Sequence, residues 1–151
     1  MTVWCLTTSP CNLARTAELG WTVQGIKSRR RNTAAQIAPG DRIVYYVSQA
    51  VAFAAIAEVT STHYEDHELI WTSGPGEDYP WRFAISPQTV LDQPHWVPVA
   101  SIQEHLEFPR KWPPQHWRLA FQGNIRAWPQ HDYDVVRGAL AQAGASSPVP
   151  P

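Results

Sequence analysis

Four of the chain's twelve basic residues stand close together, at Lys27, Arg29, Arg30 and Arg31. The rest of the chain is slightly acidic, and the formal net charge is -1. Concentrated positive charge suits a phosphate backbone, because counterion release there supplies salt-dependent affinity. A solvated surface loop explains the run equally well, and a nuclear localisation signal is a third interpretation. The run therefore favours a nucleic-acid partner without establishing one.

Aromatic residues are the second unusual feature, because eight of the 151 residues are Trp. Most of them must belong to the core of so small a protein, where each indole N–H needs a hydrogen-bond partner. A surplus of Trp and Tyr also suits an aromatic cage or a stacking slot for a planar ligand. Bases stack on such rings for about 1–3 kcal/mol each. Together with the basic run, the aromatic surplus predicts nucleic-acid binding.

Metal and catalytic signatures are weak by comparison. His63 and His67 stand four residues apart, but the order His-Tyr-Glu-Asp-His is not the zinc-protease pattern, and the segment lacks helical periodicity. The chain contains no Gly-x-Ser-x-Gly elbow, phosphate loop or dinucleotide fingerprint. A triad assembled only in space stays compatible with the sequence. We therefore expect no catalytic residues, no metal and no cofactor, and we interpret residues 63–67 as a solvated loop.

Length and composition limit the class of protein. With 44% hydrophobic and 17% charged residues, the chain has the apolar content of one folded domain. No stretch approaches the roughly 18 apolar residues of a membrane span, and the first twenty residues lack a secretion signal. Cys5 and Cys11 fit neither a Cys-x-x-Cys site nor a disulfide framework, which indicates free thiols in a reducing compartment. We expect a cytoplasmic protein with no membrane partner.

The first half of the chain contains the clearest strands. Residues 3–7 are rich in β-formers and apolar on both faces, which predicts a central strand. A helix is expected over 11–19, and a brief one beginning with Asn32 as its cap. The runs 43–47 and 51–59 are dense in β-branched, aromatic and small apolar residues, and they predict a hairpin.

The second half is punctuated by proline, since twelve of the fourteen prolines follow Trp71. This pattern predicts short segments joined by rigid loops. Alternation over 79–85 predicts a strand that Pro80 restricts to a start or an edge. Residues 101–104 have the spacing of a capping box, and 131–143 have the periodicity of a helix. Strands outweigh helices, so the pattern favours a small, closed or nearly closed β-barrel.

Several short motifs follow one another in a defined order. They are Trp4, Thr7-Thr8-Ser9-Pro10, Gly25-Ile26 before the basic run, Arg31-Asn32-Thr33, Pro39-Gly40-Asp41 leading to Tyr45-Tyr46, Tyr79-Pro80-Trp81, and Phe121-x-Gly123. Their order and spacing, over residues 2–141, resemble those of the EVE family of PUA-like domains. The resemblance covers nearly the whole chain.

The resemblance implies a fold and a function. The fold is α+β, a PUA-like small β-barrel of about five to six mostly antiparallel strands with short peripheral helices. The domain would span residues 1–142, before a flexible Pro/Ser/Ala tail over 143–151. EVE domains are similar to YTH domains, which hold methylated adenine in an aromatic cage, and are associated with modified cytosine in DNA. The implied function is a non-enzymatic module that flips a modified base, 5-methylcytosine or an oxidised derivative first, into an aromatic pocket.

The family pattern places this pocket between the first strand and the loop around Gly25. The implied pocket residues are Trp4, Thr7, Thr8, Trp21, Gln24, Gly25, Ile26, Lys27, Ser28, Tyr45, Tyr46 and Trp81. The implied phosphate contacts are Lys27, Arg29, Arg30 and Arg31. One EVE branch has Trp-x-Gly-Val-Arg-Asn at the loop, and this chain lacks that Trp and the Arg-Asn pair. The identity of the modified base therefore stays open.

Other interpretations stay open beside this one. An RNA-binding PUA-like module would use the same pocket on another kind of strand. A small enzyme acting on a nucleoside-like compound would also use it, although no residue in the sequence marks the catalytic carboxylate. A protein-interaction module predicts a large exposed apolar patch instead of a closed pocket. Under the main hypothesis the partner is nucleic acid carrying a modified base, with DNA favoured over RNA, and the protein is a monomer or weak homodimer.

Overall fold

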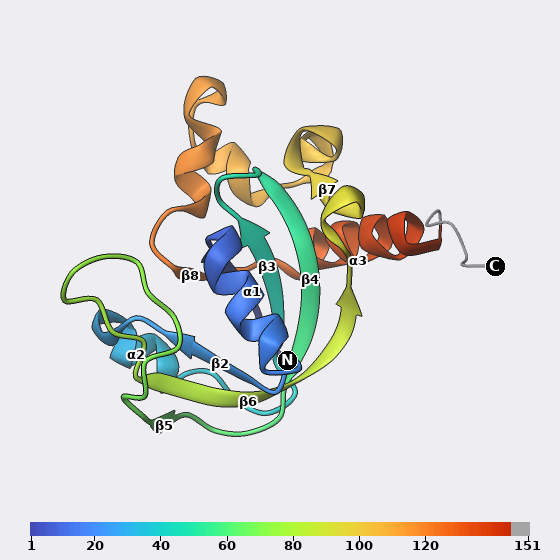
Figure 1. Cartoon of the computed structure of the whole chain (residues 1–151). Helices are drawn as coiled ribbons and strands as arrows, with labels where there is room; N and C mark the ends of the chain where they lie inside the picture. The colour runs from blue at the N-terminus through green and yellow to red at the C-terminus, as the bar shows by residue number, and fades with distance from the viewer. Residues whose placement is uncertain (146–151) are drawn as a thin grey trace.

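One curled sheet dominates the computed structural model, which describes residues 1–145 (Figure 1). The described strands are β1 (Val3–Thr8), β2 (Val23–Ile26), β3 (Arg42–Val47), β4 (Ala52–Val59), β5 (Tyr64–Glu65), β6 (Trp81–Val90), β7 (Val97–Pro98) and β8 (Ile125–Trp128). The helices are α1 (Pro10–Glu18), α2 (Arg31–Ala34) and α3 (Gln130–Ala145). Short 3₁₀ turns occur at η1 (Ser28–Arg30), η2 (Gln93–His95), η3 (Val99–Ser101), η4 (Gln103–His105), η5 (Phe108–Lys111) and η6 (Pro114–Phe121).

The strands follow the order β2-β6-β4-β3-β1-β8, with β5 beside β6 and β7 beside β4. Strands β1 and β3 run parallel, and the other pairs within residues 1–145 are antiparallel. Strand β6 changes partner along its length, because Ile85 pairs with β4 whereas Ala84 pairs with β2. The first half of β6 and β2 thereby turn away from β3 and β4 (Figure 1). The sheet is a curled half-barrel.

The expected α+β class, a small PUA-like barrel with peripheral helices, is confirmed by this architecture. The sheet has more strands than the expected number of about five to six. The shortest strands, β5 and β7, contain two residues each. Strand β8 has only four residues between a loop and Pro129, which is too short for a periodic signal.

Both faces of the central strands are buried. In β1, Val3 and Cys5 pack in a core that includes residues of α3, whereas Trp4 and Leu6 pack in the other core, which includes Leu13 of α1. A strand buried on both sides needs apolar residues at every position, which explains the unbroken runs in β1, β3 and β4. The central position expected for the first strand is confirmed, because β1 lies between β3 and β8.

Capping residues and prolines predict most of the helix and strand boundaries. Helix α1 begins after Ser9, whose hydroxyl oxygen accepts the Asn12 N–H at 3.1 Å, with Pro10 in the first turn. The hairpin is confirmed as β3 and β4. Pro80 directly precedes β6, and the C-terminal helix is confirmed as α3.

Two predicted helix starts are wrong. Ser101 does not cap a helix, because its hydroxyl donates to the Pro98 carbonyl and the chain forms the 3₁₀ turns η3 and η4. Asn32 does not cap α2, because η1 runs directly into the helix and α2 already includes Arg31.

Helix α3 extends to Ala145, beyond residue 142, where the sequence places the end of the domain. The rest of the expected tail, residues 146–151, lies outside the described residues. None of the described helices has the length and apolar character that crossing a membrane requires.

Buried Asp41 ties the start of the chain to the turn before β3. Its Oδ1 accepts the backbone N–H of Thr2 at 2.9 Å. Its Oδ2 accepts the Trp4 indole N–H and the Ala38 backbone N–H, both at 3.0 Å. The residue is 4% exposed, so these three donors replace the water around its carboxylate.

Replacing Asp41 with Ala should lower the free energy of unfolding by about 3 kcal/mol, because three buried donors lose a charged acceptor. The control is Glu18→Ala, which removes a carboxylate that is 63% exposed and pairs with the exposed Arg15. This change should cost less than about 0.5 kcal/mol. Urea denaturation followed by far-UV circular dichroism measures both, and equal small effects would contradict the role assigned to Asp41.

Candidate functional site

A cavity of about 570 Å³ opens between the end of β1, the start of α1 and two loops, 71–79 and 122–124. Its volume lies within the range of about 300–1,000 Å³ found for small-molecule sites. The lining residues are Leu6, Thr7, Thr8, Ser9, Cys11, Asn12, Lys27, Arg29, Ser48, Gln49, Trp71, Thr72, Ser73, Tyr79, Gln122, Gly123 and Asn124. The cavity thus combines two aromatic rings, many short polar side chains and two cations.

Trp71 closes one wall of the cavity. It is 2% exposed, and its indole N–H donates to the Thr16 hydroxyl at 3.0 Å. The Arg82 guanidinium lies 5.2 Å from the centre of its ring. The ring also lies so close to Gly25 that a Cβ there would be 2.6 Å from Cζ3. Gly25 is therefore required by a close approach of the wall to β2.

A chain of buried hydrogen bonds continues from this wall into the sheet. Thr16 donates to Gln24 Oε1 at 3.0 Å, and the Tyr45 hydroxyl donates to the same oxygen at 2.9 Å. The Gln24 amide nitrogen donates to the Gly25 carbonyl at 2.8 Å. Burial raises the pKa of the Tyr45 hydroxyl, which keeps it protonated as a donor. The chain connects α1, β2 and β3 to the cavity wall.

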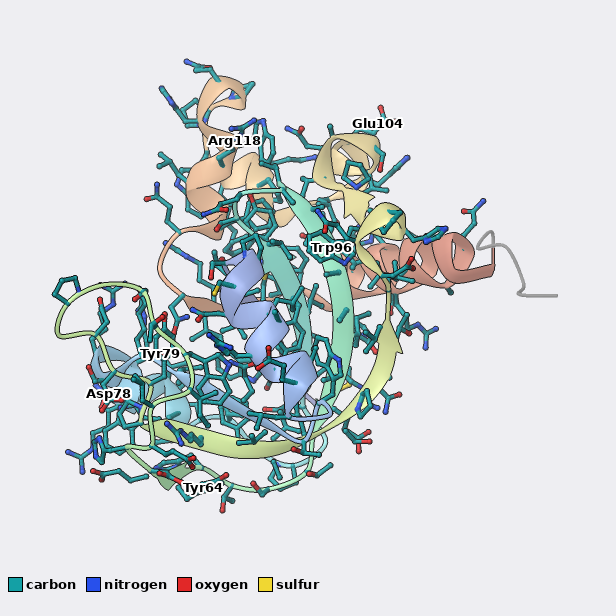
Figure 2. All side chains as sticks on the ribbon, viewed as in Figure 1. Tyr64, Asp78, Tyr79, Trp96, Glu104 and Arg118 are labelled. Atoms are coloured by element: carbon teal, nitrogen blue, oxygen red, sulfur yellow. The ribbon has the colours of Figure 1, made fainter. Side chains whose placement is uncertain are left out.

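The rest of the 71–79 loop is held at Asn12 and Tyr79. The Asn12 amide exchanges two hydrogen bonds with the backbone of Thr72, both at 3.0 Å. Burial raises the pKa of Tyr79, and hydrogen bonds with Ser73 and Asn12 oppose this shift. Tyr79 stands beside Asp78 at the front of the molecule (Figure 2).

Asn124 forms the opposite side of the cavity, in the left-handed backbone region at φ 69°. Its side-chain oxygen accepts the Lys27 N–H at 3.0 Å, and its carbonyl accepts the Thr7 N–H at 2.7 Å. The Thr7 hydroxyl donates to the Phe121 carbonyl. These bonds join the end of β1 to the beginning of the basic run.

The basic run lies close to the 122–124 loop on this side of the cavity. A Cβ at Gly123 would lie 2.6 Å from a terminal nitrogen of Arg30. Burial lowers the pKa of Arg30, and the neighbouring charges of Arg29 and Arg126 lower it further. Lys27 forms an ion pair with Glu77 at 3.8 Å. Several cations therefore share the region beside the cavity.

The structure brings three of the sequence-predicted pocket residues, Thr7, Thr8 and Lys27, to the cavity. Gln24 and Gly25 lie behind it and hold the Trp71 wall. Of the predicted phosphate contacts, Arg29 also lines the cavity. A role for these residues in binding stays a prediction.

The other predicted pocket aromatics lie elsewhere. Trp4 and Tyr45 are buried in the core that contains Leu13. Tyr46 stacks on Phe121 in the opposite core, with 4.1 Å between the ring centres. The length of β1 explains the position of Trp4, which lies about 13 Å along the strand from Thr8. Ile26 is fully buried, and Trp21 meets the Tyr45 ring edge-on at 5.1 Å.

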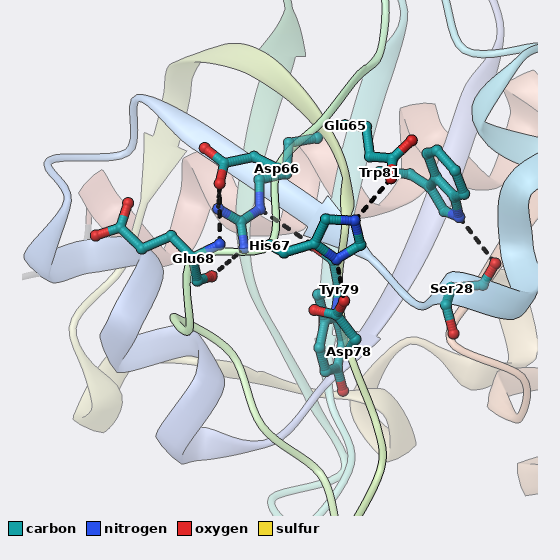
Figure 3. A network of polar contacts seen from close by, with 9 residues as sticks. Ser28, Glu65, Asp66, His67, Glu68, Asp78, Tyr79 and Trp81 are labelled. Carbon is teal, nitrogen blue, oxygen red and sulfur yellow. Dashed lines mark hydrogen bonds and ion pairs between the residues drawn. The ribbon is translucent and has the colours of Figure 1, made fainter.

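Trp81 lies on a separate surface. Its indole N–H donates to the Ser28 carbonyl at 2.8 Å (Figure 3). The Arg31 guanidinium lies 5.5 Å from the centre of its ring. This pair is outside the residues that line the cavity.

His67 forms a clamp that joins β5 to the end of the cavity loop (Figure 3). Its Nε2 lies 2.7 Å from the Glu65 carboxylate, and its Nδ1 lies 2.6 Å from the Asp78 carboxylate. The hydrogen bond with Glu65 and then that with Asp78 raise the pKa of the imidazole. No group of three metal-ligating side chains occurs among the residues that the structure describes. His67 is exposed, as expected for a solvated segment. The expected loop is wrong in part, because Tyr64 and Glu65 form strand β5 beside β6.

A family model described as "EVE domain" matches residues 2–135. The chain belongs to the EVE domain family. The UPF0310 protein of Pyrococcus abyssi is 29% identical to it over 127 residues, covering 78% of this chain and 86% of that protein. The UPF0310 protein of Pyrococcus horikoshii is 27% identical over 130 residues, with the same coverage. The resemblance drawn from the order of motifs is confirmed.

Solved structures share the fold of this EVE domain at lower identity. An NMR structure of a Rhodopseudomonas palustris protein has a TM-score of 0.60 at 16% identity, covering 94% of each chain. A crystal structure of a YTH domain has a TM-score of 0.71 at 9% identity, covering 97% of this chain and 100% of that one. The curled sheet is therefore shared with YTH domains.

Sequence reasoning missed Trp71 as a cavity wall in this EVE domain and identified Tyr79 only as part of a strand motif. Trp71 stands in a polar, glycine-containing loop without periodicity, so no local pattern marks it. The indirect signal was Gly25, because a glycine within a strand often marks the close approach of another group. That signal does not say which ring approaches.

Replacing Gly25 with Ala should displace Trp71 and lower the free energy of unfolding by about 2 kcal/mol, because the new methyl overlaps the ring and the Tyr79 carbonyl. The control is Gly138→Ala in α3, where nothing lies within 4 Å of the added Cβ. That change should stabilise the protein by about 0.5–1 kcal/mol. Urea denaturation measures both, and an unchanged Gly25→Ala protein would refute the close approach.

The pKa of His67 should lie above its ordinary value of 6.5 when measured by NMR titration of the imidazole protons. Because the folded-state pKa is raised, the clamp contributes fully below pH 6.5 and is lost as pH rises through the folded value. Asp78→Asn should lower this pKa. Asp134→Asn, a change on α3 beside Gln130, should leave it unchanged, and an equal effect of both variants would contradict the clamp.

Proposed function

We propose that this EVE domain is a non-enzymatic nucleic-acid-binding module that accepts a modified base in the 570 Å³ cavity. The cavity itself carries the proposal. Trp71 and Tyr79, which are 2% and 6% exposed, form the wall behind the cavity. The threonines at the end of β1 supply polar groups, and Lys27 and Arg29 supply positive charge. One compartment thus offers contacts for the ring, the edge and the phosphate of a single nucleotide.

The energetics favour a preformed pocket. Extruding a base costs a few kcal/mol of unstacking, and contact with aromatic rings returns about 1–3 kcal/mol for each base. Because the Trp71 N–H is already bonded to Thr16 and the Thr72 backbone to Asn12, little ordering remains to be done on binding. Gln49 also lines the cavity, so its amide can meet the base edge.

For the base we propose 5-methylcytosine or an oxidised derivative in DNA, which the family resemblance supports. A buried methyl group contributes about 0.8 kcal/mol, or about a fourfold preference over plain cytosine. Stronger discrimination requires that the pocket also disfavour the smaller base. The hydroxymethyl derivative adds a hydroxyl that the polar lining of the cavity would accommodate.

The phosphate contacts divide by position. Arg29 lines the cavity, so it is placed for the phosphate of the bound nucleotide. Lys27 is partly neutralised by Glu77, and Arg31 lies over Trp81, so both would serve neighbouring phosphates. Arg30 adds positive potential from behind Gly123.

RNA is the second candidate partner, and a specific observation favours it. A YTH-domain protein solved as a complex with RNA shares the fold at a TM-score of 0.65 and 10% identity, covering 93% of this chain and 83% of that one. A pocket for one flipped base does not by itself distinguish the two sugars, because the 2′-hydroxyl makes that distinction.

Titration of tryptophan fluorescence with matched oligonucleotides tests the proposal. DNA and RNA strands that carry one 5-methylcytosine should bind at least about fourfold more tightly than strands with plain cytosine. The preference should persist as salt weakens binding overall. Equal affinity for all strands, lost together at moderate salt, would reduce the interaction to non-specific charge attraction.

Alkylation of Cys11 locates the bound base. Cys11 is exposed and lines the cavity, whereas Cys5 is buried and burial raises its thiol pKa, so Cys11 should react first. The modified strand should protect Cys11 from iodoacetamide more than the plain strand does. Arg29→Gln should weaken the binding of both the modified and the plain oligonucleotide. Arg15→Gln, on an exposed part of α1, should change the binding of neither.

A further inference from the structure

A second basic and aromatic surface lies on the segment from Phe108 to Trp128. Its basic residues are Arg110, Lys111, Arg118 and Arg126, and it contains no acidic residue. A third of the chain's twelve basic residues therefore gathers here, although the net charge of the protein is -1. Turns η5 and η6 form the orange projection of Figure 1, and Figure 2 labels Arg118 on it.

Two tryptophans give this surface a cavity of its own. Trp112 and Trp117 are half-buried and line a volume of about 520 Å³. The charged residues of its lining are Arg110 and Glu104, and Pro109 and Pro114 also belong to it. Prolines restrict the backbone on both sides of Trp112, and the two rings pack against Phe108 and Phe121. A base that enters such a site meets rings that are already ordered.

Each of these rings carries a cation. The Arg126 guanidinium lies 5.6 Å from the centre of the Trp112 ring. The Arg118 guanidinium lies 5.6 Å from the centre of the Trp117 ring. Alternating rings and cations are what single-stranded nucleic acid requires, because bases stack while the phosphates between them are neutralised.

Arg126 also links this surface to the first cavity. Its Nε donates to the Gln122 carbonyl at 2.7 Å, and Gln122 lines that cavity. The same guanidinium reaches the Trp112 ring. A strand that leaves the first cavity past Gln122 therefore meets Arg126 and then Trp112.

We propose that the Phe108–Trp128 segment binds the unpaired nucleotides next to the base held in the first cavity. Trp112 and Trp117 stack on neighbouring bases, and Arg118 and Arg126 contact their phosphates. This inference rests on the proposed function and specifies its substrate as a strand that is unpaired beside the modified base, since pairing and stacking in a duplex cover the ring faces.

A nucleic acid suits this surface better than a peptide does. Aromatic grooves lined by tryptophan also bind proline-rich peptides, which carry no required negative charge. The segment has four basic residues and no acidic one, so a polyanion is favoured although Glu104 also lines the cavity. A proline-rich peptide is therefore included in the test as the competing ligand.

The test compares Trp117→Leu and Arg118→Gln with the controls Leu119→Ala, on the same turn, and Arg137→Gln, on α3. The ligands are a single strand of about 12 nucleotides with one 5-methylcytosine, and 5-methylcytidine monophosphate alone. Trp117→Leu should weaken strand binding about 10-fold. Arg118→Gln should reduce the slope of log affinity against log salt by about 0.7. Neither variant should change the affinity for the monophosphate, and neither control should change the affinity for either ligand.

The Trp117 ring contacts Phe121, so Trp117→Leu could lower the melting temperature of the protein. Arg118 is exposed, so Arg118→Gln tests the surface without this effect on stability. The inference is overturned if both variants bind the strand with wild-type affinity and salt slope, if the peptide binds here and the strand does not, or if the wild type binds no strand. Strand binding that depends on Trp117 without any monophosphate binding would support this surface while rejecting the first cavity as a base pocket. Monophosphate binding together with strand binding that neither variant changes would support the first cavity and reject this surface.

Discussion

The buried hydrogen bonds from Trp71 through Thr16 to Gln24 and Tyr45 are the constraint on which the candidate site depends. Gln24 Oε1 accepts from both hydroxyls, so each of its acceptor positions is used. An apolar residue at Thr16 or Gln24 would leave the remaining members unsatisfied in a low-dielectric core. These hydrogen bonds therefore fix the distances between α1, β2, β3 and the 71–79 loop.

The curl of the sheet creates the cavity whose wall these hydrogen bonds hold. Because β6 pairs first with β2 and then with β4, the end of β2 lies near the end of β1, and Asn124 bonds to both Thr7 and Lys27. The gap that remains between these ends is the cavity. Its cations come from the basic run after β2, and Thr7 and Thr8 at the end of β1 supply hydroxyl groups. Its aromatic wall belongs to the 71–79 loop, which hydrogen bonds anchor to α1. Such a site is rigid where a base would stack and adaptable where a phosphate would bind.

The fold follows from the sequence to a large extent. The unbroken apolar runs of β1, β3 and β4 predict strands buried on both faces, and the order of the motifs predicts the EVE family. Short strands such as β8 escape prediction because four residues show no periodicity. Ser101 fails as a cap because its hydroxyl finds a nearer acceptor in Pro98, an outcome decided by backbone geometry rather than by spacing.

The candidate site follows from the sequence only in part. The family pattern places Thr7, Thr8 and Lys27 at a pocket, and all three line the cavity. Trp4 and Tyr46 could not be assigned correctly to pocket or core, since both uses call for an aromatic residue in a strand. Trp71 escapes altogether, because its position depends on a long-range contact with Gly25 and a hydrogen bond to Thr16. Non-local contacts of this kind leave no pattern in the neighbouring residues.

The most direct test of the central claim is the indole N–H region of a ¹⁵N–¹H correlation spectrum during addition of a strand that carries one 5-methylcytosine. The Trp71 signal, assigned with a Trp71→Phe variant, should shift at lower concentrations of this strand than of one with plain cytosine. The amides of Thr7, Thr8 and Lys27 should shift with it. If these signals stay in place while the strand binds, the cavity is not the site of base recognition.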